Sequence, residues 1–142
     1  MDADRSNQGD VLQDATVLVT GGAGSVGRML VDRLLELNVD IVRIYDNNEP
    51  NLADMKASIG NGRLRYLGGD IRDKPRLERA MQGVDVVVHT AAMKHVDISE
   101  YNPFEAVKTN VVGIQNVIDT AIDQGVERVV FTSSDKAVNP AN

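Results

Sequence analysis

The sequence contains no cysteine and only two histidines. Disulfide bonds and cysteine-based metal or redox chemistry are therefore excluded, and no zinc site is expected. No apolar run approaches the roughly 18 residues that a membrane span requires. Basic residues are fewer than acidic ones: the sequence contains 15 lysines and arginines and 21 aspartates and glutamates, which gives a net charge of −6. This balance argues against general binding to nucleic acid or to an anionic membrane.

The amino terminus lacks the features of a signal peptide. Its first ten residues, "MDADRSNQGD", are polar and acidic, whereas a signal peptide has a basic start and an apolar stretch. We expect a cytoplasmic protein with a flexible polar tail over residues 1–14. Residues 15–142 contain no repeat, low-complexity tract or linker. With 42% hydrophobic residues overall, this part is predicted to form one domain.

Five short apolar runs are typical of strands that are buried on both faces of a parallel sheet. They cover residues 17–20, 40–46, 63–70, 84–90 and 128–134.

Segments with helical periodicity separate these runs. The first begins at Ser25, with an apolar stripe at Val26, Leu30, Leu34 and Leu37. The second covers residues 50–60, with Leu52, Met55 and Ile59 on one side and Gly60 as its stop. The third is capped by Asp73, has Pro75 early and closes at Gly83. The longest begins at Asn102 and Pro103, ends at Gly125 and has on one face Val107, Val111, Ile114, Ile118 and Ile122.

The alternation of strands and helices predicts the fold class. Right-handed crossovers between parallel strands lead to a doubly wound sheet. We therefore expect an α/β, Rossmann-type fold of about five parallel strands in three αβα layers. In such a fold, function belongs to the loops that follow the strands.

A glycine-rich segment, "VTGGAGSVG" at residues 19–27, follows the first strand. Gly21, Gly24 and Gly27 have the spacing G-x-x-G-x-x-G. Such a turn lets a phosphate approach the backbone, and the helix N-terminus offers free N–H groups with a partial positive charge. Gly27 is also small enough for the helix to pack on the strand. We predict that this turn binds a pyrophosphate.

The glycine turn allows two other interpretations. A triphosphate-binding loop needs G-x-x-x-x-G-K-[ST], but Arg28 and Met29 follow the closest register, so the lysine and the magnesium-binding hydroxyl are missing. A turn that only lets a helix pack would suffice for an isolated match. The preceding strand, the following helix and Asp46 favour the cofactor site.

Asp46 ends the second predicted strand, about 20 residues after the last glycine. An acid at this point accepts hydrogen bonds from the hydroxyls of an adenosine ribose and repels a 2′-phosphate. Asn47 and Asn48 add no positive charge. The pattern therefore favours NAD over NADP, with NADP as the alternative. On its own, Asp46 could equally be a turn residue at the end of a strand.

Six motifs in order resemble the extended short-chain dehydrogenase/reductase family. They are "TGGAGSVG" (20–27), "GDIRD" (69–73), "HTAAMKHV" (89–96), "YNP" (101–103), "KTNVVGIQNVI" (108–118) and "SSDKAVNP" (133–140). More narrowly, they are similar to the inverting UDP-N-acetylglucosamine 4,6-dehydratases and related polysaccharide-biosynthesis proteins. The resemblance extends from about Thr16 to the last residue.

The resemblance implies roles for individual residues. The pyrophosphate would be lined by Gly21, Gly24, Ser25, Val26 and Gly27. Asp70 and Ile71 would lie against the adenine, and Ala91, Ala92 and Lys94 along the nicotinamide ribose. Asn110 matches an asparagine that supports the active site. The alternatives are a turn residue for Asp70, a solvated charge for Lys94 and a helix residue bonded to a carbonyl for Asn110. His89 and His95 are interpreted as packing or loop residues.

The "SSDK" motif implies the chemistry of water elimination. In the family's 4,6-dehydration, hydride leaves C4 of the sugar for the cofactor, water is eliminated across C5 and C6, and hydride returns to C6. Elimination needs a base and an acid, and a carboxylate beside an ammonium can supply both. By this resemblance Asp135 and Lys136 are the acid/base pair and Ser134 the hydroxyl. Without the other motifs, the segment would be interpreted as an exposed turn.

The family's Tyr-x-x-x-Lys motif is missing from these 142 residues. Each tyrosine is followed four positions later by an acid: Glu49 after Tyr45, Asp70 after Tyr66 and Glu105 after Tyr101. The expectation is therefore the cofactor-binding part of an enzyme that acts on UDP-N-acetylglucosamine or another nucleotide sugar, inactive alone. By the same resemblance, we expect the remaining strands and the sugar-binding region to lie outside these 142 residues. The fifth strand would then be an edge beside exposed apolar surface, which favours self-association into a homo-oligomer.

Two alternative functions remain open. A non-catalytic dinucleotide sensor or interaction module would explain the missing tyrosine but not the Asp135 and Lys136 pair. An epimerase or another nucleotide-sugar dehydratase would share most motifs. Asp46 also departs from the more basic pattern expected of NADP-using members.

Overall fold

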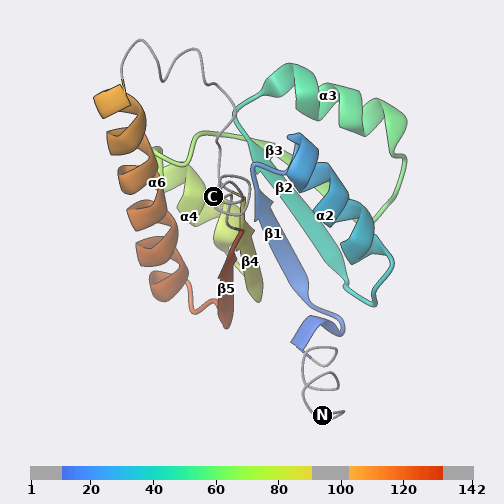
Figure 1. Cartoon of the computed structure of the whole chain (residues 1–142). Helices are drawn as coiled ribbons and strands as arrows, with labels where there is room; N and C mark the ends of the chain where they lie inside the picture. The colour runs from blue at the N-terminus through green and yellow to red at the C-terminus, as the bar shows by residue number, and fades with distance from the viewer. Residues whose placement is uncertain (1–10, 91–102, 133–142) are drawn as a thin grey trace, which may run out of the picture.

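The computed structural model describes residues 11–90 and 103–132 and contains a five-stranded parallel sheet (Figure 1). The strands are β1 (Thr16–Thr20), β2 (Ile41–Asp46), β3 (Leu64–Gly68), β4 (Val86–His89) and β5 (Arg128–Phe131). Their order in the sheet is β3-β2-β1-β4-β5, and all neighbours are parallel. The predicted doubly wound sheet is confirmed, and its order reverses between β1 and β4.

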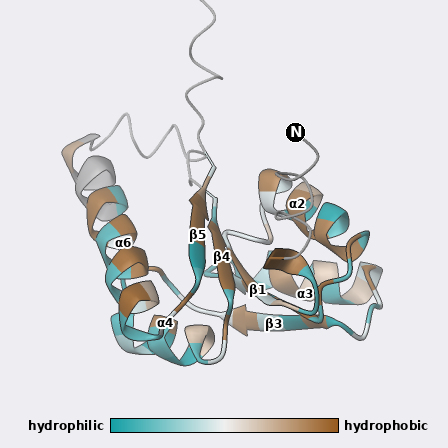
Figure 2. Ribbon diagram, turned by 90° about the horizontal axis from the view of Figure 1, so that it is seen from below, coloured by the Kyte–Doolittle hydropathy of each residue, from teal (hydrophilic) through white to brown (hydrophobic). Residues whose placement is uncertain are grey.

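Helices cover both faces of this sheet (Figure 2). They are α2 (Ser25–Leu35), α3 (Glu49–Ser58), α4 (Lys74–Met81) and α6 (Pro103–Asp123). Helices α2 and α3 share one hydrophobic core with the sheet, and α4 and α6 share a second core on its other face. The three predicted layers are therefore confirmed.

The central strand β1 shows how one short sequence supports two cores. Val17 and Val19 belong to the core beneath α2 and α3, whereas Leu18 belongs to the core beneath α4 and α6. All three side chains are fully buried. Successive strand residues point to opposite faces, so a continuous apolar run is what a strand covered on both sides requires.

Two polar side chains cap helices at their amino ends. The Asp73 carboxylate accepts a hydrogen bond from the Arg76 N–H at 3.3 Å, which confirms the cap predicted for α4. Asn48 caps α3 in the same way, through Asn51 N–H at 3.0 Å. Helix α3 ends at Ser58, and Ile59 is its C-cap in an extended conformation, so the helix ends just before the predicted stop at Gly60. This conformation lets the Ile59 side chain pack on the core.

The apolar stripe predicted for α2 is partly wrong. The helix buries Gly27, Val31 and Leu34 and ends at Leu35, whereas Val26 and Leu37 are exposed. The reason is the close approach of Gly27 to the backbone of the preceding turn. This approach rotates the helix so that the face containing glycine, and not the most apolar face, lies against the sheet.

The apolar stripe predicted on one face of α6 is exposed for the residues whose side chains are described. Val111, Ile114, Ile118 and Ile122 are between 37% and 72% exposed, and the Val107 side chain lies outside the described set. The helix instead packs through Val117, Thr120 and Ala121, with Gly113 against Ile71. Small side chains allow α6 to approach its neighbours closely, and hydropathy alone does not indicate this.

Residues 11–14, which were expected to belong to a flexible tail, form a helical turn. Val11 and Leu12 pack against the core, and the Asp14 N–H donates to Asn38 O at 2.7 Å. The apolar pair accounts for this difference, since burial of both side chains favours an ordered turn.

Within residues 11–90 and 103–132, no helix combines the length and hydropathy needed to cross a membrane.

Candidate functional site

The turn between β1 and α2 lies at the carboxyl end of the central strand and is formed largely by backbone. The Gly21 N–H donates to Tyr45 O at 2.8 Å, and the Gly24 N–H donates back to Gly21 O at 3.2 Å. Gly21 has a φ of +70°, and a Cβ there would collide with Thr90 Oγ1. Only glycine therefore fits at the start of the turn.

Gly22 and Gly27 allow the turn and the helix to touch. A Cβ on Gly22 would lie 2.7 Å from Ile44 Cγ2, and one on Gly27 would lie 2.5 Å from Gly22 Cα and collide with Gly21 O. The obstacles at Gly27 are backbone atoms, which cannot move aside as a flexible side chain can. The packing role predicted for Gly27 is thus observed.

The amino end of α2 has no side-chain cap. Its N-cap, Gly24, has no side chain to accept the first helical N–H groups, and the first turn contains no acid. Ser25 and Val26 in this turn are exposed. Free N–H groups and the positive end of the helix dipole favour an anion at this position.

Asp46 lies beside this turn at the end of β2 and is 9% exposed. Its Oδ2 accepts a hydrogen bond from the Ala23 N–H at 3.0 Å, and its Oδ1 accepts one from the Asn48 N–H at 2.8 Å. A carboxylate has about four lone-pair positions, so acceptor capacity remains on both oxygens. Sequence reasoning missed the bond to Ala23, through which Asp46 fastens the glycine turn to β2.

The loop after β3 contains Asp70 and Ile71. Tyr45 Oη donates to Asp70 O at 2.8 Å, and the Asn116 side chain of α6 donates to Ile71 O at 3.0 Å. Burial and nearby carboxylates raise the pKa of Tyr45 to about 12, so its hydroxyl keeps the proton that it donates. Sequence reasoning missed both supporting residues. Tyr45 lies in no motif, and Asn116, although it lies in the 108–118 motif, is 45 residues away from Ile71 in sequence.

The Asp70 carboxylate is held by Arg72. Its Oδ2 lies 3.0 Å from Arg72 Nη2, and its Oδ1 accepts bonds from the Arg72 N–H at 2.8 Å and Nε at 3.1 Å. The hydrogen bonds from Arg72 lower the pKa of Asp70 below its ordinary value. Asp70 is therefore an ionised acceptor at neutral pH.

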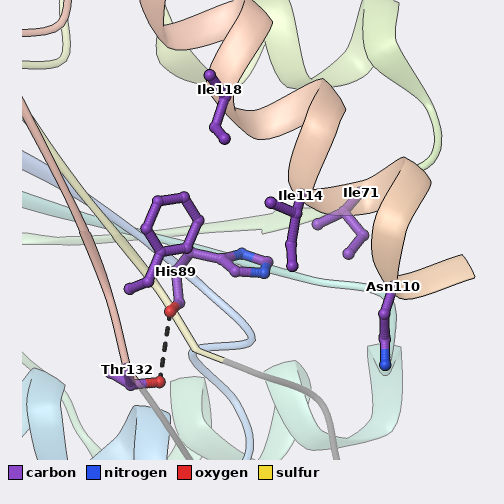
Figure 3. A pocket seen from close by; sticks show the side chains of 7 residues that line it. Ile71, His89, Asn110, Ile114, Ile118 and Thr132 are labelled. Carbon is purple, nitrogen blue, oxygen red and sulfur yellow. Dashed lines mark hydrogen bonds between the residues drawn. The ribbon is translucent and has the colours of Figure 1, made fainter. Parts of the chain in front are cut away.

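A cavity of about 300 Å³ opens between α6, β4 and β5 (Figure 3). It is lined by Ile71, His89, Asn110, Ile114, Ile118, Phe131 and Thr132. Ile71 and Asn110, predicted as cofactor-site residues, thus lie at the same cavity. We call the exposed apolar wall formed by Ile114, Ile118 and Phe131 the α6–β5 face.

His89 is a packing residue in the structure, as expected. Its Nδ1 lies 2.6 Å from Thr20 Oγ1, and its ring meets Phe131 edge-to-face at a centroid distance of 5.6 Å. Burial lowers the pKa of His89, so the ring is neutral at pH 7. The Thr132 hydroxyl donates to the backbone oxygen of His89 at 3.3 Å (Figure 3).

The described part of the predicted site lies along one edge of the sheet. Gly21, Gly24, Ser25, Val26 and Gly27 follow β1, Asp46 ends β2, and Asp70 and Ile71 follow β3. The other predicted site residues lie outside the described residues: Ala91, Ala92, Lys94, Ser134, Asp135 and Lys136. His95 and Asn102 also lie outside them. Within the described part, no group of three or more His, Cys, Asp or Glu side chains could hold a metal ion.

A doubly wound parallel sheet with a glycine turn at its point of reversal defines a Rossmann-type α/β domain. The sequence profile of the family described as polysaccharide biosynthesis protein matches residues 17–142. The chain belongs to this family, which agrees with the resemblance found in its motifs.

Relatives support this assignment over most of the chain. An uncharacterised membrane protein of Methanocaldococcus jannaschii is 52% identical over 92% of this chain and 39% of its own length. An inverting UDP-N-acetylglucosamine 4,6-dehydratase of Campylobacter jejuni is 46% identical over 89% of this chain and 38% of its own length. A UDP-glucose 4-epimerase of Rickettsia prowazekii is 41% identical over 91% of this chain and 39% of its own length.

The fold also matches a solved structure, the dTDP-glucose 4,6-dehydratase DesIV of Streptomyces venezuelae with NAD and TYD bound. Its TM-score is 0.69 and its identity 41%, covering 80% of this chain and 38% of that one. The chain thus spans about 40% of the length of the relatives it matches.

Proposed function

We propose that this chain is the cofactor-binding part of a nucleotide-sugar-modifying enzyme and that it binds NAD along the carboxyl edge of β1, β2 and β3. The observation that carries the proposal is the pairing of an uncapped α2 N-terminus with the buried Asp46 carboxylate across one glycine turn. One feature suits a pyrophosphate and the other a ribose. The NAD bound to DesIV supports the same cofactor class.

The residues divide between the parts of the cofactor. The turn residues Gly21, Gly24, Ser25, Val26 and Gly27 would hold the pyrophosphate, and Asp46 the adenosine ribose. Asp70 and Ile71 would meet the adenine, Ala91, Ala92 and Lys94 would lie along the nicotinamide ribose, and Asn110 would support the active site. When bound, the dinucleotide supplies hydride acceptance and return. The protein's own groups bind, orient and move protons.

For the chemistry, we propose water elimination from UDP-N-acetylglucosamine in the whole protein. Asp135 and Lys136 would act as the acid/base pair and Ser134 as the supporting hydroxyl. The 46% identity to the C. jejuni dehydratase supports this reaction. Epimerisation of a nucleotide sugar is the second candidate, because the Rickettsia epimerase is 41% identical over a similar span.

The 142-residue chain is proposed to be inactive alone, since these residues contain no Tyr-x-x-x-Lys motif. Incubation with UDP-N-acetylglucosamine and NAD should give no keto-sugar, and detection of that product by mass spectrometry would refute the proposal. We further propose a cytoplasmic location, on the polar amino-terminal sequence. Self-association is proposed on the exposed α6–β5 face, and sedimentation as a clean monomer would contradict it.

Calorimetric titration of the purified chain with NAD and NADP tests the cofactor proposal. The Asp46→Ala variant should bind NAD roughly ten- to a hundred-fold more weakly, because hydrogen bonds to a charged group contribute about 1.5–3 kcal/mol. Glu36→Gln, an exposed change at the far end of α2, is the matched control and should bind like the wild type. Failure of a folded wild-type chain to bind either dinucleotide would refute the cofactor assignment.

A further inference from the structure

Arg28 follows the last glycine of the turn, and its side chain reaches from α2 to α3. Its Nη2 forms an ion pair with Asp54 Oδ2 at 3.0 Å and donates to Asn51 O at 3.4 Å. Its Nε donates to Ala23 O at 3.4 Å. The Arg28 side chain is 34% exposed and that of Asp54 is 68% exposed. The guanidinium is therefore held at the surface by groups of α3 and the turn.

Arg28 and Asp46 hold the same turn residue from two sides. Asp46 accepts from the Ala23 N–H, and Arg28 donates to the Ala23 carbonyl. The guanidinium and the carboxylate that is proposed to bind the adenosine ribose thus bond to the same residue, Ala23. In dinucleotide-binding sites of this architecture, a nearby arginine accommodates the 2′-phosphate of NADP. This chain carries such an arginine, although its Asp46 favours NAD.

We propose that Asp54 is a specificity-determining residue that withholds Arg28 from a 2′-phosphate. By pairing with the guanidinium, Asp54 supplies the negative charge that a 2′-phosphate would otherwise supply and directs Arg28 toward α3. Two acids then select NAD by different routes. Asp46 repels the 2′-phosphate, and Asp54 pairs with the Arg28 guanidinium that would otherwise bind this phosphate. This inference rests on the proposed function, because it concerns the same cofactor site.

The size of the effect follows from the exposure of the pair. An exposed ion pair contributes at most about 1 kcal/mol, which corresponds to a roughly five-fold change in an equilibrium constant. Removing the Asp54 charge should therefore increase NADP affinity by about five-fold. NAD affinity should change less than about two-fold, because NAD has no group that competes for Arg28.

The test is the ratio of dissociation constants for NADP and NAD, measured by titration of the full 142-residue chain. Asp54→Asn should lower this ratio by about five-fold. Asp54→Glu, which keeps the charge, should stay closer to the wild type, and the Glu36→Gln variant should equal it. Adding Arg28→Gln to Asp54→Asn should restore the wild-type ratio, because the freed guanidinium is then absent. If Asp46 makes NADP binding too weak to measure, the same variants are compared in the Asp46→Asn background.

The outcomes separate this inference from the proposed function. If wild type binds NAD and Asp54→Asn leaves the ratio unchanged in both backgrounds, Asp54 only joins α2 to α3 and the inference is overturned. An equal fall in NAD and NADP affinity, with a lower unfolding temperature, overturns it as well. If the folded wild type binds neither dinucleotide, the proposed function itself fails, and this inference fails with it.

Discussion

The glycine turn after β1 and the α6–β5 face belong to one sheet but differ in how their surfaces are packed. At the turn, helix and strand meet through backbone, and Gly27 leaves no space for a single added carbon. At the α6–β5 face, Ile114 and Ile118 are 38% and 37% exposed, and Phe131 is 42% exposed. The contact between the turn and α2 is tightly packed within the described residues, whereas the α6–β5 face presents apolar side chains to solvent.

This difference separates two kinds of sequence signal. A glycine at a backbone contact has no alternative, since any Cβ collides with atoms that cannot move. An apolar residue on a helix has alternatives, because burial is decided by which face the neighbouring elements cover. The turn could therefore be recognised from its spacing, whereas the orientation of α6 could not be inferred from its hydropathy.

The largest expected effect comes from closing the space at the turn. Gly27→Ala should destabilise the chain by about 3 kcal/mol, because the new Cβ meets the backbone of Gly21 and Gly22 and the helix must move away. Chemical unfolding followed by circular dichroism measures this loss.

Gly62→Ala is the matched control for the turn. Nothing lies within 4 Å of a Cβ at Gly62, and its φ is outside the left-handed region. Its stability should be unchanged or raised by up to about 1 kcal/mol. Equal stabilities of the two variants would contradict the closed packing of the turn.

A smaller effect should distinguish two neighbours on α6. Val117 is fully buried and Ile118 is 37% exposed, although isoleucine is the more apolar residue. Val117→Ala should cost about 2 kcal/mol through the cavity that it leaves, and Ile118→Ala should cost less than about 1 kcal/mol. Urea unfolding of both variants measures the difference. The reverse ranking would show that α6 packs through its most apolar face after all.

The smallest effect concerns His89, which touches Thr20 at the base of the turn and Phe131 on the α6–β5 face. Burial lowers its pKa from 6.5 in the folded chain. The unfolded chain then binds more protons, so this contribution to stability is complete above pH 6.5 and is lost as pH falls through the folded pKa. The free energy of unfolding should therefore decrease as the pH is lowered from 7 to 5.

His89→Gln should reduce this pH dependence, because glutamine does not titrate. Asp70 does not confuse the comparison, since its pKa is lowered from 3.8 and it stays ionised over this range. An unchanged slope in the variant would mean that His89 titrates in the folded chain as it does in the unfolded chain.

Most of the fold could be predicted from local patterns. The five apolar runs, the cap at Asp73 and the turn at Gly83, with its φ of +77°, depend on residues close together in sequence. The errors concern faces of helices and ends of elements. In α2 the face that contains Gly27, Val31 and Leu34 is buried in place of the predicted stripe. In α3 the helix ends at Ser58, and the extended Ile59 packs on the core.

The candidate site could be predicted in part for the same reason. The glycines and Asp46 follow from spacing and from their position at strand ends. The bond from Ala23 to Asp46, the support of the Asp70 loop by Tyr45 and Asn116, and the Arg28 and Asp54 pair join residues that are distant in sequence. No spacing rule relates such residues before the sheet brings them together.

From its order of residues alone, this chain is committed to alternating strands and helices and to a turn that requires glycine at positions 21 and 27. These properties arise from steric limits and periodicities that act within a few residues. Tertiary structure decides which helix faces are buried, how Asp46 is oriented and which acid pairs with Arg28. Those outcomes depend on contacts between elements that are far apart in the chain, and such contacts exist only when the sheet is assembled.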